Sequence, residues 1–235
     1  MEAVIEVWNI DLAKLPPPSE AALAALDDDE RRRHASYLVA ESARIFATTR
    51  LALRKLIGAR TRQPSCAVRL ALDAHGKPFA PDHLHLSFNV SHCETTALIA
   101  FCDTGPVGVD IENSPRKPAP QPLAAMICTD AELVWLRANP LLADSALGRL
   151  WSRKEAVVKA WGTGLAQDVS RIELGNPGQG SGVVEVPDGP RTVWRDLDCP
   201  NAQAAAVAAT SSEATGIRVR MRSFTETLAG GTNVN

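Results

Sequence analysis

Two acidic residues, Asp110 and Glu112, lie two positions apart in the segment 107–112, VGVDIE. Side chains alternate along a strand, so the three apolar residues of this segment share one face and leave both carboxylates on the other, about 6 to 7 Å apart at their backbones. Like charges so close repel, and a divalent cation that prefers oxygen ligands is one way to hold them. A pair of solvated acids at a strand end is the alternative interpretation.

Trp151, Glu155 and Lys159 are spaced by four in a segment with helical character, so they fall on one ridge of a helix. Glu155 is a candidate third ligand for a cation, and Lys159 a candidate phosphate contact. The alternative is a surface Glu–Lys pair worth about 0.2 to 0.5 kcal/mol, with Trp151 in the core.

Two glycine-containing segments could bring backbone or a cation to a ligand. Gly162 and Gly164 follow the helix and could let the backbone approach a bound molecule, or simply end the helix. Gly76-Lys77-Pro78 is typical of a turn that exposes Lys77 at its tip, either toward a ligand or as an ordinary hairpin lysine.

Ser91 and His92 follow a predicted strand, where side chains often project from a sheet end into a cleft. A hydroxyl, an imidazole and loop amides together could hold phosphate oxygens. A catalytic Ser/His pair is disfavoured, because adjacent residues on an extended chain point to opposite sides. A histidine that caps a loop is the structural alternative, and the other four histidines have no acidic or cysteine partner.

The stretch between Glu41 and Asp73 contains seven basic residues and no acid. It is either a solvated helix face or a docking surface for an anionic ligand or acidic protein. The segment 31–33, RRR, could extend it. The seven residues are Arg44, Arg50, Arg54, Lys55, Arg60, Arg62 and Arg69.

The elements that must position these residues are a mixture of helices and short strands. Apolar periodicity predicts a helix over 42–57, with Ile45, Thr49, Ala52, Leu53 and Leu56 on one side and Arg44, Arg50, Arg54 and Lys55 on the other. A second helix is predicted over 150–161. Strands are predicted over 86–90, 97–101, 107–111, 192–195 and 217–224, with a loop at 175–182 and a frayed end at 226–235. This mixture indicates an α+β fold with antiparallel sheets.

The proline-rich segment 113–122, NSPRKPAPQP, is the candidate boundary, and it divides the 235 residues nearly in half. A net charge of −2 argues against binding nucleic acid through bulk charge. No apolar run reaches about 18 residues, and the amino terminus has acids where a signal peptide needs bases, so we expect a cytoplasmic protein without a membrane span. Five cysteines without a Cys-x-x-Cys pair indicate reduced structural thiols.

Four motifs in order resemble the 4'-phosphopantetheinyl transferases of the surfactin-synthetase type: Gly76-Lys77-Pro78, Phe88 to His92, Gly108 to Glu112, and Trp151 to Lys159. The resemblance implies two similar α+β halves, 1–106 and 107–235, related by a pseudo-twofold. It places coenzyme A in the cleft between the halves, and it implies a monomer.

The resemblance also implies a reaction: transfer of 4'-phosphopantetheine from coenzyme A to a serine of an apo acyl or peptidyl carrier protein, with release of adenosine 3',5'-bisphosphate. Mg²⁺ would be held by Asp110, Glu112 and Glu155. Glu155, or a water that it orients, would be the base, and Lys159 would neutralise the pyrophosphate. The implied coenzyme A contacts are Arg33, Arg44, Lys77, Ser91, His92, Asp110, Glu155 and Lys159.

The sequence departs from the family pattern at two positions near its amino terminus. Ile45 aligns with an arginine of many relatives, and Glu30 with a basic residue. Arg44, Arg31 or Arg33 are therefore candidate substitutes in binding the adenosine end. The alternatives to a transferase are a catalytically silent relative that binds coenzyme A or carrier protein, and an unrelated Mg²⁺-dependent phosphohydrolase.

Overall fold

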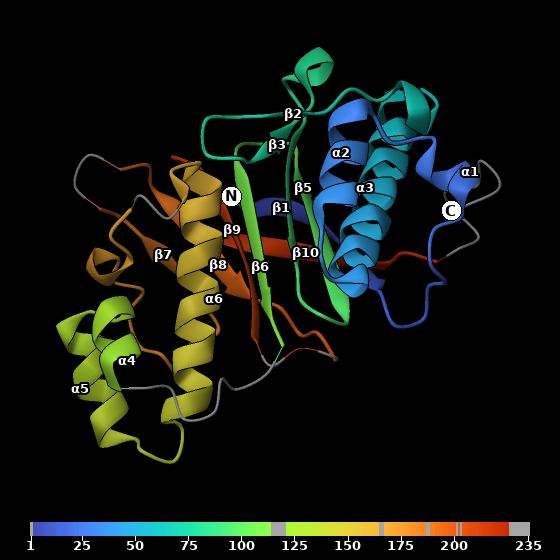
Figure 1. Cartoon of the computed structure of the whole chain (residues 1–235). Helices are drawn as coiled ribbons and strands as arrows, with labels where there is room; N and C mark the ends of the chain where they lie inside the picture. Colours follow the sequence, from blue (N-terminus) through green and yellow to red (C-terminus); the bar gives the residue numbers. More distant parts are fainter. Residues whose placement is uncertain are drawn as a thin grey trace.

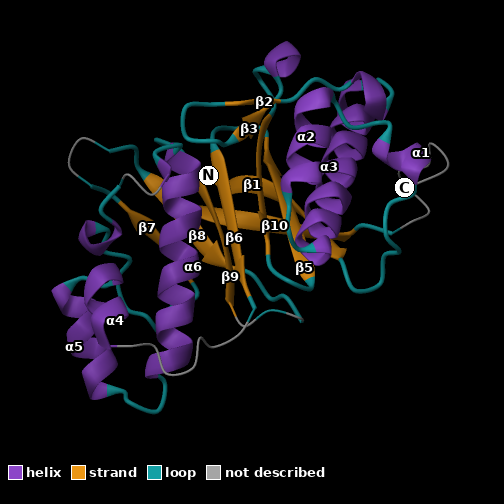
Figure 2. Ribbon diagram, in the orientation of Figure 1, coloured by secondary structure: helices purple, strands orange, loops and turns teal. Residues whose placement is uncertain are grey.

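The computed structural model describes residues 2–113, 121–164, 167–186, 189–200, 202 and 204–225. Two four-stranded sheets pack face to face, and one long helix covers the outer side of each sheet (Figure 1). The core between the sheets is built from small and branched apolar side chains, among them Ile5, Leu98, Val109 and Val207. The strands thus lie between two layers of helix (Figure 2).

The first sheet has the strand order β10–β1–β5–β4 and is covered by helix α3. Strand β1 pairs antiparallel with β5 and parallel with β10, and β5 pairs antiparallel with β4. The bounds in this sheet are β1 (Glu2–Asp11), β4 (Ser87–His92), β5 (Thr96–Cys102) and β10 (Gly216–Ser223). Around it lie α1 (Glu20–Leu23), α2 (Asp28–Ser36), α3 (Ala40–Thr61), η1 (Ser65–Ala67), η2 (Pro81–His83) and the small hairpin β2 (Ala71–Leu72) with β3 (Pro78–Phe79).

The second sheet has the strand order β6–β9–β8–β7, entirely antiparallel, and is covered by helix α6. Its strands are β6 (Val107–Glu112), β7 (Ser181–Val184), β8 (Thr192–Asp196) and β9 (Ala204–Thr210). The helices of this half are α4 (Gln121–Ile127), α5 (Asp130–Ala138), α6 (Ala143–Trp161) and η4 (Val169–Arg171).

The two halves share a pattern of a strand, a long helix and two further strands, to which the first half adds the hairpin β2–β3 and the second half adds β7 and β10. In the first half β1 is followed by α3, β4 and β5, which pair in the order β1–β5–β4; in the second, β6 is followed by α6, β8 and β9, which pair as β6–β9–β8. The predicted α+β fold with antiparallel sheets is confirmed. The parallel pair β1–β10 is an exception that the sequence analysis did not foresee, and it carries a strand of the second half into the first sheet.

The two sheets meet where β4 lies beside β6. The Ser87 hydroxyl accepts a hydrogen bond from the Val107 amide (3.1 Å), and the Asn89 side-chain oxygen accepts one from the Val109 amide (2.9 Å). Two side chains of β4 thus satisfy backbone donors of β6 that a strand neighbour would otherwise take. The next residue on this face of β4 is Ser91.

The structure confirms the two predicted helices and the five predicted strands, shortens the predicted loop 175–182 because β7 begins at Ser181, and corrects one face of a helix. The helix over 42–57 is present as part of α3, and its predicted apolar side is buried. Arg54 was predicted on the solvated side, but it is only 1% exposed and forms ion pairs with Glu30 and Asp27. Most of the proline-rich boundary and all of 226–235 lie outside the described residues. In the described part of the chain no helix is both long and apolar enough to span a bilayer.

Candidate active site where the two sheets meet

Gly108 allows helix α6 to lie directly on strand β6. A Cβ atom at this position would be 2.0 Å from the Ala156 carbonyl oxygen and 2.5 Å from the Ala160 amide nitrogen, so a side chain has no room. The face of β6 that carries Gly108 also carries Asp110 and Glu112. Close packing at the glycine therefore brings both carboxylates against the helix.

Asp110 is buried and receives hydrogen bonds from two other elements. Its Oδ2 accepts from the Ser152 hydroxyl on α6 (2.8 Å). Its Oδ1 accepts from the Ser91 hydroxyl on β4 (3.0 Å) and from the Lys159 ammonium on α6 (2.6 Å). Three predicted site residues, Ser91, Asp110 and Lys159, thus come together in space although they are far apart in sequence.

Glu112 and Glu155 complete the acidic group. The Glu112 Oε1 accepts a hydrogen bond from the Trp151 indole (2.8 Å). Glu155 has a buried Oε1 without a hydrogen-bond partner, while its Oε2 lies 3.8 Å from the Lys159 ammonium. Burial raises the pKa of Glu155, the charges of Asp110 and Glu112 raise it further, and Lys159 opposes them.

The donor set is chemically suited to a hard divalent cation. Asp110, Glu112 and Glu155 offer carboxylate oxygens, and one oxygen of Glu155 has no partner. The charges of Asp110 and Glu112 raise the pKa of Glu155, which indicates that the three acids lie near one another. Within the described ranges no three acidic, histidine or cysteine side chains already surround one point. Lys159 and the Ser91 hydroxyl instead both donate to Oδ1 of Asp110, the oxygen that Ser152 does not hold.

Lys77 folds inward instead of standing at an exposed tip, as the turn sequence predicted. Its ammonium donates to the carbonyl oxygens of Val107 on β6 (3.1 Å) and of Lys159 on α6 (2.7 Å). Burial lowers the pKa of Lys77 to about 8; Asp73 raises it and Lys159 adds to the lowering. Lys77 therefore reaches the site beside Lys159.

The glycines that follow α6 have separate roles. Gly162 adopts a left-handed conformation (φ 74°) directly after the helix, as a C-terminal cap requires. Gly164 lies against His75 of the turn that carries Lys77, since a Cβ there would be 3.6 Å from the His75 Cβ. The loop after the helix thus packs on that turn.

A second group of cations lies beside the carboxylates. The guanidinium groups of Arg33 and Arg50 lie over the Phe46 ring, at 5.2 and 5.5 Å from its centroid. His92 remains accessible, and partial desolvation lowers its pKa, as do the charges of Lys159, Arg33 and Arg50. In the described part of the chain Arg33 has no carboxylate partner, and Arg50 has only Glu30 at 4.0 Å. Such a cluster is electrostatically suited to an anion.

Arg50 is the residue of this cluster that the sequence analysis did not single out. It was one of seven bases in the run between Glu41 and Asp73, and nothing in its spacing sets it apart. The usable signal was its position one helical turn after Phe46, which places both on one face of α3.

Arg44 and the two departures from the family pattern are explained by local packing. Arg44 forms an ion pair with Glu41 (2.6 Å) and donates to the Leu12 carbonyl (2.8 Å), and no described contact joins it to the site. Ile45 is buried in the core, and buried Glu30 accepts from Arg54 (2.7 Å). A coenzyme A contact by Arg44 stays a prediction.

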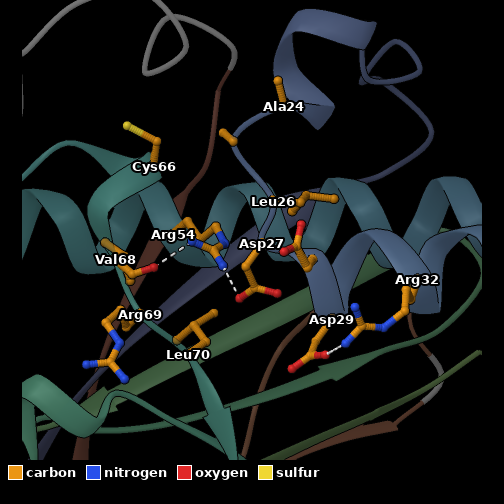
Figure 3. Close-up of a pocket in the computed structure, with 12 residues that line it drawn as sticks. Ala24, Leu26, Asp27, Asp29, Arg32, Arg54, Cys66, Val68, Arg69 and Leu70 are labelled. Carbon is orange, nitrogen blue, oxygen red and sulfur yellow. Dashed lines mark hydrogen bonds and ion pairs between the residues drawn. The ribbon is translucent and has the colours of Figure 1, made fainter.

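The rest of the basic run is largely paired with acids. Arg54 is buried against Asp27, Arg60 bonds to Glu6, and Arg69 lies 3.3 Å from Asp82. Arg54 also lines a cavity of about 500 Å³ between α1, the start of α2 and η1, on the outer side of α3 (Figure 3). None of the site residues described above lines this cavity.

Both halves of the sequence match known families. Residues 16–103 match the profile described as "4'-phosphopantetheinyl transferase, N-terminal", and residues 106–208 match "4'-phosphopantetheinyl transferase superfamily". Together these ranges contain every site residue identified from the sequence.

Individual relatives support the same assignment. The chain is 31% identical over 139 residues to 4'-phosphopantetheinyl transferase Sfp of Bacillus subtilis strain 168, covering 58% of the chain and 60% of the relative. It is 30% identical over 159 residues to another Bacillus subtilis 4'-phosphopantetheinyl transferase, covering 63% and 70%. The mouse L-aminoadipate-semialdehyde dehydrogenase-phosphopantetheinyl transferase is 28% identical over 150 residues, covering 59% and 48%.

Proposed function

Because this chain belongs to the 4'-phosphopantetheinyl transferase superfamily, we propose that it transfers 4'-phosphopantetheine from coenzyme A to a serine of an apo acyl or peptidyl carrier protein. The observation that carries the proposal is the grouping of Asp110, Glu112, Glu155 and Lys159 where β6 meets α6, with Ser91 of β4 beside them.

The reaction requires a base, and Glu155 is suited to that role. The carrier serine hydroxyl gives its proton to the Glu155 carboxylate while its oxygen bonds to the β-phosphorus of coenzyme A. The bond from that phosphorus to the bridging oxygen breaks, and adenosine 3',5'-bisphosphate leaves. Burial and the neighbouring acids raise the pKa of Glu155, which makes its carboxylate a stronger proton acceptor than an exposed glutamate.

The cations of the site are suited to hold the anionic co-substrate. Lys159 neutralises charge on the pyrophosphate, and Lys77 and Ser91 bind phosphate oxygens beside it. Arg33 and Arg50 supply positive charge for the phosphates at the adenosine end, and the neighbouring His92, whose pKa is lowered, offers a neutral imidazole N–H as a hydrogen-bond donor. Ligand phosphate would then provide the anionic partner that Arg33 lacks among the described residues.

Asp110, Glu112 and Glu155 would hold Mg²⁺, which when bound supplies positive charge that helps the bridging oxygen leave. The hard carboxylate oxygens and the unpartnered Glu155 Oε1 support this assignment. Ser152 holds one oxygen of Asp110, and Ser91 and Lys159 both donate to the other. For Asp110 to hold Mg²⁺ through that second oxygen, Ser91 and Lys159 would have to release it.

We propose a monomer that acts in the cytoplasm. Ser91 of the first sheet and Asp110 of the second are hydrogen-bonded within one chain, which supports the monomer. The five cysteines are all free thiols in the structure, as suits a reducing compartment.

Intact mass spectrometry tests the function. Apo acyl and peptidyl carrier proteins are incubated with the protein, coenzyme A and Mg²⁺, and we expect the carrier mass to rise by one phosphopantetheine group. Glu155→Gln should slow transfer by about 100-fold or more, since general base catalysis contributes about 10²- to 10⁴-fold. A chelator should also abolish the gain, whereas Glu185→Gln, at an exposed position of the second half, should react normally.

Two results would contradict the proposal. Normal turnover by Glu155→Gln would remove Glu155 from the mechanism. Coenzyme A binding without transfer to any carrier would identify a catalytically silent relative instead.

A further inference from the structure

Four successive residues of helix α6 bond to other elements: Trp151 and Ser152 to β6, Arg153 to β8, and Lys154 to α5. Arg153 makes two hydrogen bonds to Asp196 on β8 (2.7 and 2.6 Å), and fully buried Lys154 bonds to Glu132 on α5 (2.6 Å). These two cations join α6 to its neighbours, and none of their hydrogen bonds within the described residues goes to Asp110, Glu112 or Glu155. The motif therefore contains anchoring residues beside the proposed base.

Trp151 and Ser152 make a different kind of contact. The Trp151 indole donates to Glu112 and the Ser152 hydroxyl to Asp110, each at 2.8 Å. Ser152 has no exposed surface, so water cannot replace its hydrogen bond. Two adjacent residues of one helix thus each hold one oxygen of the two carboxylates of β6.

We propose that Trp151 and Ser152 are positioning residues, which each hold one carboxylate oxygen of Glu112 and Asp110 and so fix the orientation of the oxygen that remains for a cation. The proposal rests on the function proposed above, in which these acids hold Mg²⁺ against coenzyme A. It assigns a role in the reaction to two side chains that touch neither substrate.

Mutual repulsion makes such fixing necessary. Two carboxylates on one strand face repel, and the terminal torsion of an aspartate is soft, so each group would turn away from its neighbour unless held. An indole and a hydroxyl are neutral donors. They can hold a carboxylate oxygen without taking the place of Mg²⁺, as the charged ammonium group of a lysine would. Outer partners of metal ligands typically contribute 10- to 100-fold to metal affinity or activity.

The test compares two truncations with a matched control. Trp151→Phe and Ser152→Ala each remove one donor and keep most of the side-chain volume. Trp161→Phe removes an equivalent indole donor from the same helix, but one that bonds to the Thr192 hydroxyl (2.6 Å), away from the carboxylates. Ser152→Thr retains the hydroxyl and serves as the rescue variant.

Calorimetric titration of coenzyme A at a series of Mg²⁺ concentrations is the principal measurement, with transfer kinetics and melting temperature alongside. We expect Trp151→Phe and Ser152→Ala to raise the Mg²⁺ concentration needed for half-maximal binding about 10-fold or more. Trp161→Phe should leave it unchanged even if its melting temperature falls, and Ser152→Thr should approach the wild-type value.

Unchanged Mg²⁺ dependence in both truncations would overturn the proposal, as would an equal shift in Trp161→Phe. Binding also separates this proposal from the proposed function. If the wild type binds coenzyme A with Mg²⁺ but modifies no carrier, the proposed transferase activity is contradicted. The positioning role can still be tested in that case from the Mg²⁺ dependence of coenzyme A binding. If Mg²⁺ does not affect binding in the wild type, the positioning role fails too.

Discussion

Lys77 shows how surroundings change the chemistry of a single residue. Burial lowers the pKa of its ammonium to about 8, so the Lys77 side chain is mostly deprotonated and neutral above that pH. A phosphate that binds beside it favours the charged form and raises that pKa. We therefore predict that coenzyme A binding between about pH 8 and 10 takes up protons.

Calorimetry in buffers of different ionisation enthalpy measures that uptake. Lys77→Met should reduce the number of protons taken up on coenzyme A binding, because the variant has no amine to protonate. Lys14→Met, at an exposed lysine paired with Asp11, should leave that number unchanged. Equal proton uptake by Lys77→Met and the wild type would show that Lys77 does not face a phosphate.

At the residue scale, sequence spacing predicted pairs within one element better than contacts between elements. Asp110 and Glu112 share a strand face, and period-two alternation places them correctly. Arg54 was misplaced because helical periodicity cannot show that Glu30 and Asp27, about 24 residues earlier, cover that side of α3. The contact of Trp151 with Glu112 likewise depends on how α6 lies on β6.

At the element scale, Gly108 sets the distance between β6 and α6. Gly108→Ala would place a methyl group against the helix backbone at 2.0 Å, so the helix must move outward. Overpacking of this kind costs typically about 1 to 3 kcal/mol, and we expect the free energy of unfolding to fall by about 3 kcal/mol. Transfer should fall further, because Glu155 and Lys159 move away from Asp110.

Gly216→Ala is the control for this substitution. Gly216 also lies in a strand, but a Cβ there meets nothing within 4 Å. Chemical denaturation should find this variant close to the wild type in stability, and transfer should be unaffected. A Gly108→Ala protein with wild-type stability and turnover would show that the helix is not held at the distance that the structure gives.

Elements with strong local patterns were predictable, whereas those defined by their neighbours were not. Strand β9 has the sequence AAAVAAT, and alanine has little preference for strands, so only pairing with β6 and β8 on either side makes it one. Helix α4 begins at the end of the proline-rich segment and α5 follows it, and neither was predicted. Helix α5 begins with a capping box at Thr129 and Glu132, which was an available but unused signal.

For the whole molecule, the decisive feature is a core that belongs to both sheets. Ile5 of the first sheet and Val109 and Val207 of the second lie in one cluster of buried side chains. Strand β10 strengthens the connection, because it comes from the end of the chain but pairs with β1. The division into 1–106 and 107–235 stays a prediction about sequence, while the packing indicates a single cooperative unit.

Ile217 of β10 tests that cooperativity, since it is buried among residues of both sheets. Ile217→Ala should lower the free energy of unfolding by about 2 to 5 kcal/mol. Hydrogen exchange should then show the amides of β5 and of β9 losing protection equally, because both sheets open together. Met221→Ala, at an exposed position of the same strand, should change neither. Loss of protection in β5 alone would mean that the halves unfold separately, and that the site between them can open without global unfolding.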